Sequence, residues 1–217
     1  MKTHSLLIFS FLIITACTQA QSSSDKFDLK QYRKNIQKER QKKNKEFKES
    51  DSSPLSKKAR KKFRKLTYYP VNPTYRVQAT MEVTPDTKFF EMPTSSGKIK
   101  RFRQYALLHF TLHGKKIKLP IYQGQALMFV PKYRNYIFIP FTDLTNGKTT
   151  YGAGRYIEYY LPKNQPSSKG KTRKITLDFN TAYNPYCAYN TGYSCPIPPR
   201  ANHLPIKIKA GEKQFQK

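Results

Sequence analysis

The sequence is poor in acidic residues and contains no Trp. In 217 residues, 13 Asp and Glu stand against 41 Lys and Arg, which gives a formal net charge of +28. A charge of this sign favours polyanionic surroundings such as nucleic acid, anionic lipid headgroups or the phosphates of lipopolysaccharide, without choosing among them. Aromatic character comes instead from 16 Tyr and 14 Phe. This balance suits β-strands, because these rings fit a pleated, half-buried surface.

The apolar run near the N-terminus is too short to cross a bilayer. It extends from Leu6 to Ile14, after Lys2 and His4, whereas a spanning helix needs about 20 residues. Its length and its basic start are typical of the apolar region of a signal peptide. The run therefore predicts export and excludes a spanning helix at this position.

The residues that follow, Ile14-Thr15-Ala16-Cys17, resemble a bacterial lipobox, whose cysteine becomes the lipidated N-terminus. The alternative is an ordinary secretory signal cut elsewhere. Thr18 stands where an inner-membrane retention signal usually has Asp, which favours the outer membrane, facing the periplasm. We therefore expect a signal peptide over 1–16 and fatty acylation such as palmitate at Cys17, so that lipid chains hold the protein at the membrane.

The chain has only two cysteines besides Cys17, and this scarcity argues against a zinc site. Cys187 and Cys195 are eight residues apart with Gly192 between them. In an oxidising compartment we favour a disulfide over free thiols or a metal site. Zinc would need CxxC-type pairs and further ligands, and only His203 is near in sequence. We predict no metal and no cofactor.

A chain of 217 residues that is 37% hydrophobic can bury one core plus an appendage. We assign residues 17–52 to a tether and a basic helix, and residues 53–217 to a single β-rich domain. Apolar residues at helical spacing mark one side of the first helix: Leu29, Tyr32, Ile36 and Phe47. Arg40 and Lys43 interrupt this stripe, so we expect the middle of the helix to be solvated. Ser56 is a good N-cap for a second, short helix through Lys65.

Two functions fit the basic helix. Between residues 26 and 65, seventeen Lys and Arg stand against five Asp and Glu. The helix could attach to an anionic surface or to nucleic acid, or it could be a solvated spacer between lipid and domain. A charge run without aromatic interleaving carries little specificity, so we favour the spacer and consider nucleic acid an improbable partner.

The sequence pattern in the body of the chain predicts β-strands. Residues 74–83 alternate between apolar and polar side chains, which predicts a half-buried strand. Further strands are expected over 88–92, 99–112, 116–122, 126–130, 136–141, 150–161, 174–179 and 204–208. Turn residues at 95–97, 113–115 and 146–147 predict hairpins. Strands this closely spaced must be antiparallel, so we predict a mainly β (α+β) fold, an antiparallel sandwich or small barrel with N-terminal helices.

The stretch from Phe138 to Lys213 is the candidate site region, because it is rich in Gly, Pro, Asn and Tyr. The sequence Gly152-Ala153-Gly154-Arg155 indicates either a structural bend or an anion pocket made by amide groups and a guanidinium. The candidate ligand-binding residues are Asp143, Arg155, Tyr156, Asp178, Asn180, Tyr183, Asn184, Tyr186 and Glu212. Their amides and rings suit a carbohydrate or peptidoglycan cleft, although an ordered loop satisfied by its own amides explains them equally well.

Two classes of function follow from these residues. We favour a binding or structural module for an envelope ligand: a glycan, peptidoglycan or an anionic lipid headgroup. The alternative is an envelope hydrolase that uses Asp143 and Asp178 with Arg155. No nucleophile elbow or HExxH sequence accompanies these residues. The sequence leaves the oligomeric state open.

Several motifs resemble one known family. These are SPLSKKARKKFRKLTYYPVNPTYRV, FTDLTNGKTTYGAGRYI, DFNTAYNPYCAY and CPIPPRANHLPIKIKAGEK. Together they are similar, from Ser53 to Lys213, to an uncharacterised bacterial lipoprotein family, domain of unknown function 1684. The resemblance implies no activity. The family pattern P-P-x-E-N-R-L corresponds here to Pro198–Leu204, with Ala201 in place of the acid and His203 in place of the arginine. The resemblance therefore supports no catalytic acid at Ala201.

Overall fold

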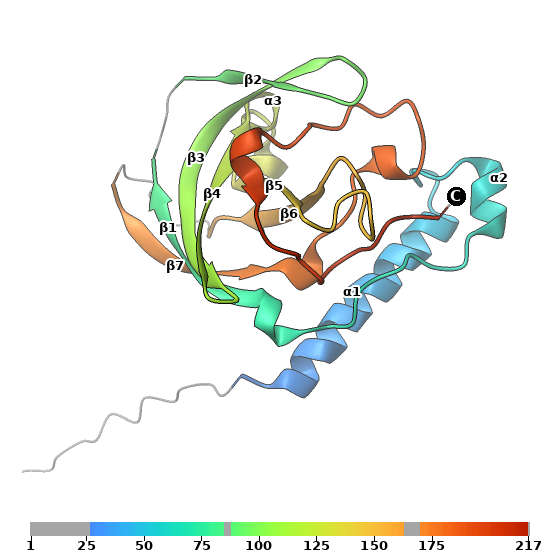
Figure 1. Ribbon diagram of the computed structural model, residues 1–217. Helices are drawn as coiled ribbons and strands as arrows, with labels where there is room; N and C mark the ends of the chain where they lie inside the picture. The colour runs from blue at the N-terminus through green and yellow to red at the C-terminus, as the bar shows by residue number, and fades with distance from the viewer. Residues whose placement is uncertain (1–26, 85–87, 163–169, 217) are drawn as a thin grey trace, which may run out of the picture.

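The computed structural model describes residues 27–84, 88–162 and 170–216, and a strongly curled β-sheet dominates it (Figure 1). The strands are β1 (Arg76–Val83), β2 (Phe90–Pro93), β3 (Ile99–Leu112), β4 (Lys115–Gly124), β5 (Tyr136–Asp143), β6 (Arg155–Tyr160), β7 (Thr172–Asp178) and β8 (His203–Leu204). Their order is β6-β5-β4-β3-β1-β7, with β2 on β3 and β8 parallel to β5. The mainly β, α+β class is confirmed, and the antiparallel sheet curls into half a barrel.

The hairpin of β3 and β4 follows the turn chemistry of the sequence. Leu112 pairs with Lys115 across His113 and Gly114, which have φ angles of 49° and 75°. Two successive positive φ angles are what a type I′ hairpin turn requires. Along β3 the register shifts between Gln104 and Ala106. Such a bulge bends and twists a strand, which contributes to the curl of the sheet.

The core fills the inside of the curled sheet. Alternate residues of β1 are buried, as predicted: Ala79, Met81 and Val83. Phe179, which follows β7, contacts Phe141 of β5, with ring centroids 5.3 Å apart. The main cluster joins β1, β3, β4, β5 and β7 to the C-terminal segment through Ile206, Ile208 and Ala210.

Two predicted strands are wrong. Residues 126–130 were expected to be extended but contribute to helix α3 (Gln125–Met128), because Ala, Leu and Met favour a helix and Gly124 begins it. The final strand over 204–208 shrinks to β8. Beyond it one more backbone bond runs from the Leu144 N–H to the Ile206 carbonyl at 3.0 Å, and then side chains take over: the Ile208 N–H donates to Asp143 and its carbonyl accepts from Arg155.

Both N-terminal helices form. Asp28 caps α1 (Leu29–Glu49) by accepting from the Gln31 N–H at 3.0 Å, and Ser56 caps α2 (Lys57–Lys62). A second apolar cluster ties them to the body: Phe47, Leu55, Phe63, Leu66, Ala188 and Tyr189. Short 3-10 turns complete the chain: η1 (Pro73–Tyr75), η2 (Pro131–Tyr133), η3 (Phe179–Thr181), η4 (Tyr186–Ala188) and η5 (Arg200–Asn202).

Helix α1 runs diagonally below the open side of the curled sheet, and α2 lies beside its C-terminal end (Figure 1). Within the described ranges no helix is both long and apolar enough to cross a membrane. The predicted leader and Cys17 lie outside the described residues.

Candidate functional site

Helix α1 is held to the body by polar side chains in the middle of its inner face. Arg40 donates through Nη1 to the Tyr69 carbonyl at 2.9 Å, and its guanidinium lies 4.4 Å from the centroid of the Tyr68 ring. The Lys43 Nζ lies 3.3 Å from Oε2 of Glu212. The expectation of a solvated middle is therefore wrong, because acceptors of the body replace water around both cations.

Glu212 is the acceptor at the centre of this attachment, and it is only 1% exposed. Besides Lys43, it accepts from the Asn184 backbone N–H at 3.2 Å, from Asn184 Nδ2 at 3.1 Å and from the Tyr189 hydroxyl. A buried carboxylate is tolerated only when it is paired and hydrogen-bonded. Glu212 therefore joins the C-terminal segment to α1, and Asn184 helps to hold its carboxylate in place.

A cleft of about 790 Å³ opens between two parts of the molecule. One side is α1, and the other is formed by the segment after β7 (residues 180–186) and the end of the disulfide loop (residues 193–196). This volume lies within the range of small-ligand sites. Six aromatic residues line it: Phe47, Tyr68, Tyr156, Tyr183, Tyr186 and Tyr193. The charged residues of the lining have both signs: Arg40, Lys42, Lys43 and Lys100 against Glu39, Glu46 and Glu158.

The aromatic rings stand against one another as a wall. Tyr186 is 44% exposed, and its ring centroid lies 5.2 Å from that of Tyr193 and 6.5 Å from that of Phe47. Tyr156 and Tyr183 make a perpendicular pair at 5.9 Å. Their backbones also exchange two hydrogen bonds, at 2.9 and 3.0 Å. The edge of the sheet at β6 therefore fixes the position of the second ring pair.

Glu158 supplies an exposed carboxylate to the cleft. Its Oε1 accepts from the Tyr183 hydroxyl at 2.6 Å and from the Tyr136 hydroxyl at 3.4 Å. Burial, Tyr136 and Glu158 raise the pKa of Tyr183 well above its ordinary value. The Tyr183 hydroxyl therefore stays protonated and donates to Glu158, whose exposed carboxylate lines the cleft.

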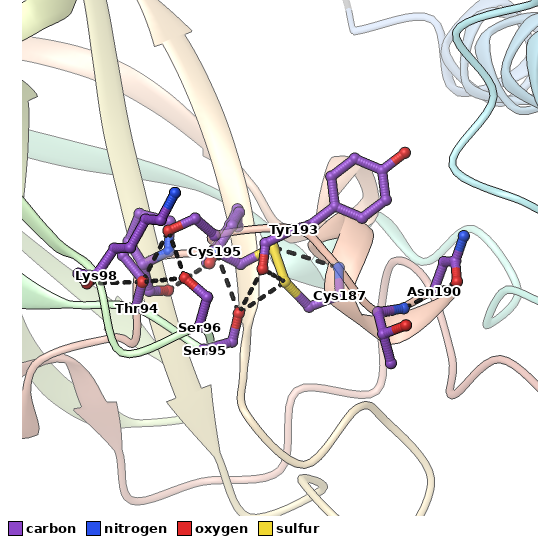
Figure 2. Close-up of a disulfide and its surroundings, with 12 residues drawn as sticks. Thr94, Ser95, Ser96, Lys98, Cys187, Asn190, Tyr193 and Cys195 are labelled. Carbon is purple, nitrogen blue, oxygen red and sulfur yellow. Dashed lines mark hydrogen bonds between the residues drawn. A yellow bond between two sulfur atoms is a disulfide. The ribbon is translucent and has the colours of Figure 1, made fainter.

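A disulfide closes the loop that carries Tyr193 and begins next to Tyr186. The sulfurs of Cys187 and Cys195 lie 2.17 Å apart, which confirms the predicted pair. Figure 2 shows the β2–β3 turn beside the bond: Ser95 donates to the Tyr193 carbonyl at 3.2 Å and accepts from the Cys195 N–H at 3.2 Å. Tyr186 directly precedes the first cysteine. The cross-link therefore constrains the part of the wall that Tyr186 and Tyr193 form.

Asp143 and Arg155 meet in the core, away from the cleft. Both side chains are 0% exposed, and Nη2 of Arg155 donates to Oδ2 of Asp143 at 2.9 Å. Arg155 also donates to the carbonyls of Ile208, Ala210 and Glu212. Burial lowers the pKa of Arg155, and Asp143 opposes this shift. The guanidinium thus organises the C-terminal backbone. Of the two readings of its Gly-Ala-Gly-Arg motif, this geometry favours the structural one.

Asp178, at the end of β7, contacts the N-terminal part of α1. Its Oδ2 accepts from the Tyr32 hydroxyl at 2.8 Å, and its Oδ1 accepts from the Asn180 N–H at 2.9 Å. Burial, assisted by the hydrogen bond to Asp178, raises the pKa of Tyr32. The Asn180 side chain exchanges hydrogen bonds with the backbone of Asn72, at 2.8 and 2.9 Å. These contacts hold the N-terminal part of α1 against the end of β7, and the segment after β7 against Asn72.

The candidate residues therefore divide into two groups. Those that line the cleft are Tyr156, Asn180, Tyr183 and Tyr186. Those that do not are Asp143, Arg155, Asp178, Asn184 and Glu212. Sequence reasoning missed the residues that α1 supplies, above all Arg40 and Lys43. Cations placed within the apolar stripe of a helix were the signal that could have found them.

A comparison with known protein families identifies the family of this chain. Residues 61–213 match the model of a family described as a protein of unknown function, DUF1684. The chain belongs to the DUF1684 family. A similar fold occurs in the solution NMR structure of an uncharacterized protein from Haloarcula marismortui. The two are 34% identical with a TM-score of 0.62, and the match covers 85% of this chain and 95% of that one. A comparison with curated proteins gives no match.

The cleft offers no evident metal site. Across the residues that the structure describes, no group of three or more His, Cys, Asp or Glu side chains could hold a metal ion. The side chains that line the cleft of this DUF1684 protein offer rings, hydroxyls, carboxylates, ammonium groups, a guanidinium and an amide.

Proposed function

We propose that this DUF1684 protein is an exported, lipid-anchored protein of the cell envelope whose cleft binds a glycan. The observation that carries the proposal is the wall of tyrosine rings beside the carboxylate of Glu158. A sugar presents an apolar face that packs on aromatic rings and hydroxyls that need acceptors and donors. The cleft supplies both along one surface.

Two features of the chain support the envelope. The lipobox-like sequence ending at Cys17 follows a run typical of a signal peptide. The Cys187–Cys195 disulfide suits an oxidising compartment outside the cytosol. In this proposal the acyl chains hold the protein at the outer membrane, facing the periplasm.

The alternative, an envelope hydrolase acting through Asp143, Asp178 and Arg155, has less support. Asp143 and Arg155 have no exposed surface and satisfy one another and the C-terminal backbone. Asp178 is occupied by Tyr32 and Asn180. A hydrolytic acid must reach its substrate, so the geometry supports binding better than hydrolysis.

Calorimetric titration of the purified protein tests the glycan proposal. The probes are a soluble N-acetylglucosamine tetramer and a muropeptide from digested peptidoglycan. Tyr186→Ala removes an exposed ring of the wall and should weaken binding about fivefold, since one aromatic contact contributes about 1 kcal/mol. Phe129→Ala, at a residue that is 79% exposed and outside the cleft lining, is the control. Absence of binding by both probes, or an equal loss in both variants, would contradict the proposal.

Localisation has a separate test. Cells that express the protein are labelled with a palmitate analogue, and their membranes are separated by density. The wild-type chain should carry label and sediment with the outer membrane, whereas Cys17→Ser should lose the label. An unlabelled wild-type chain of full length among the soluble cell contents would refute the anchor.

A further inference from the structure

The outward face of α1 carries positive charge in a regular row. Ile36 and Phe47 are buried and mark the inner face, so residues about half a turn away point to solvent. That outer side presents a row of exposed lysines: Lys30, Lys34, Lys38, Lys45 and Lys48. At 1.5 Å per residue the row is about 27 Å long.

Negative charge on α1 is segregated from this row. Glu39 and Glu46 both line the cleft on the other side of the helix. Glu49, at the C-terminal end, is the carboxylate next to the row, 3.9 Å from the Lys45 Nζ. A merely solvated helix gains stability from Glu and Lys placed four residues apart, whereas lysines at that spacing repel one another. Lys30, Lys34 and Lys38 stand at that spacing, so this part of the row lowers helix stability and leaves one face positive.

Helix α2 extends the same charge. It packs beside the C-terminal end of α1 (Figure 1). Its exposed residues are Lys57, Lys58, Lys61 and Lys62, and Arg64 and Lys65 follow. From residue 52 to residue 81 the sequence contains no Asp or Glu. Nothing acidic in this stretch therefore offsets the field of the lysine row.

We propose that this lysine row and α2 dock on an anionic membrane surface through phospholipid headgroups. The surface is separate from the cleft, and the inference does not depend on glycan binding. Lysine is a hydrated point charge that suits a diffuse layer of anions, whereas arginine suits bidentate recognition. The row contains only lysines and no aromatic residue on which a base could stack. These features favour a membrane over nucleic acid.

The test measures co-sedimentation of the full chain with vesicles of phosphatidylglycerol and phosphatidylcholine in equal parts. All variants carry Cys17→Ser, so that lipidation and the common leader do not distinguish them. The row is neutralised by K34Q/K38Q/K45Q, since Gln and Lys have similar helix propensities. The matched control, K98Q/K132Q/K171Q, removes the same charge from three exposed lysines elsewhere on the body. Circular dichroism checks that the helix content is unchanged.

Each lysine near an anionic surface contributes about fivefold in affinity. Loss of three should therefore weaken vesicle binding roughly 100-fold at low salt, while the control changes it less than about threefold, because distant charges are screened. Equal losses in the two triple variants, or no loss in either, would overturn the proposal. It would also be overturned if duplex DNA bound more tightly than the vesicles at the same salt and lost its affinity in K34Q/K38Q/K45Q.

Discussion

Replacing Arg155 with Met should destabilise the protein by about 3–5 kcal/mol, because it leaves a buried charge without its partner. The Asp143 carboxylate is 0% exposed and lies 2.9 Å from the lost guanidinium. Three backbone carbonyls, of Ile208, Ala210 and Glu212, would lose a donor at the same time. Since whole domains are stable by only about 5–15 kcal/mol, this one change should remove a large share of the total.

The measurement is equilibrium unfolding in urea, followed by tyrosine fluorescence and circular dichroism. Arg103→Met is the matched control, because Arg103 is partly exposed and bonds to a neutral side chain, Gln123. It should cost about 1–2 kcal/mol, less than Arg155→Met, because it leaves the buried Gln123 oxygen without its donor but leaves no buried charge unpaired. The double variant Arg155→Met/Asp143→Asn removes both charges and should recover stability relative to Arg155→Met alone. A cost below about 1 kcal/mol for Arg155→Met, or a double variant no more stable than the single one, would refute the reasoning.

Three further predictions concern a glycine, the disulfide and a tyrosine. Gly211→Ala should lower the free energy of unfolding in urea by at least about 2 kcal/mol, because φ is +73° and the new Cβ would lie 2.6 Å from a backbone oxygen. The control Gly97→Ala has a similar φ of +78° but open space around the new Cβ, so it should cost less. Cys187→Ser/Cys195→Ser should lose about 2.5 kcal/mol, the chain-entropy value for so short a loop, and reducing agent should destabilise only the wild type. Burial, and after it Glu212, raises the pKa of Tyr189 well above its ordinary value. In the unfolded chain this tyrosine ionises near pH 10. The stabilisation that Tyr189 provides is therefore complete below about pH 10 and is lost as the pH rises further. Tyr189→Phe should therefore flatten the fall in unfolding free energy between about pH 9 and pH 11, and an unchanged slope would contradict this assignment.

The sequence allowed the strands to be predicted well where side chains alternate over a sheet with one buried face. Residues 99–112 were assigned with the bounds that β3 has, because both the alternation and the His113-Gly114 turn are local signals. The segment after Leu204 was misassigned for the opposite reason. Its alternating burial persists at Ile206 and Ile208, but the hydrogen-bond partners of Ile208 are side chains distant in sequence. No local pattern reports such partners.

The candidate site was half predictable for a related reason. Asn- and Tyr-rich composition indicated the segment that carries Tyr183 and Tyr186, and both line the cleft. Composition does not distinguish a polar group that faces a ligand from one that serves the core. Arg155 and Glu212 look like site residues in the sequence, yet both are buried and paired. The sequence did not show which of these polar side chains are buried.

The buried ion pairs also explain how α1, which forms one side of the cleft, is held in position. Helix α1 buries only Ile36 and Phe47 fully, which is little apolar area for a helix of 21 residues. Polar contacts must therefore fix its position, and one of them joins Lys43 to the buried carboxylate of Glu212. Arg155 holds the backbone carbonyl of Glu212 and thereby places that carboxylate. The core thus sets the position of α1, so that one face of the helix closes the cleft while its lysines remain directed to the outside.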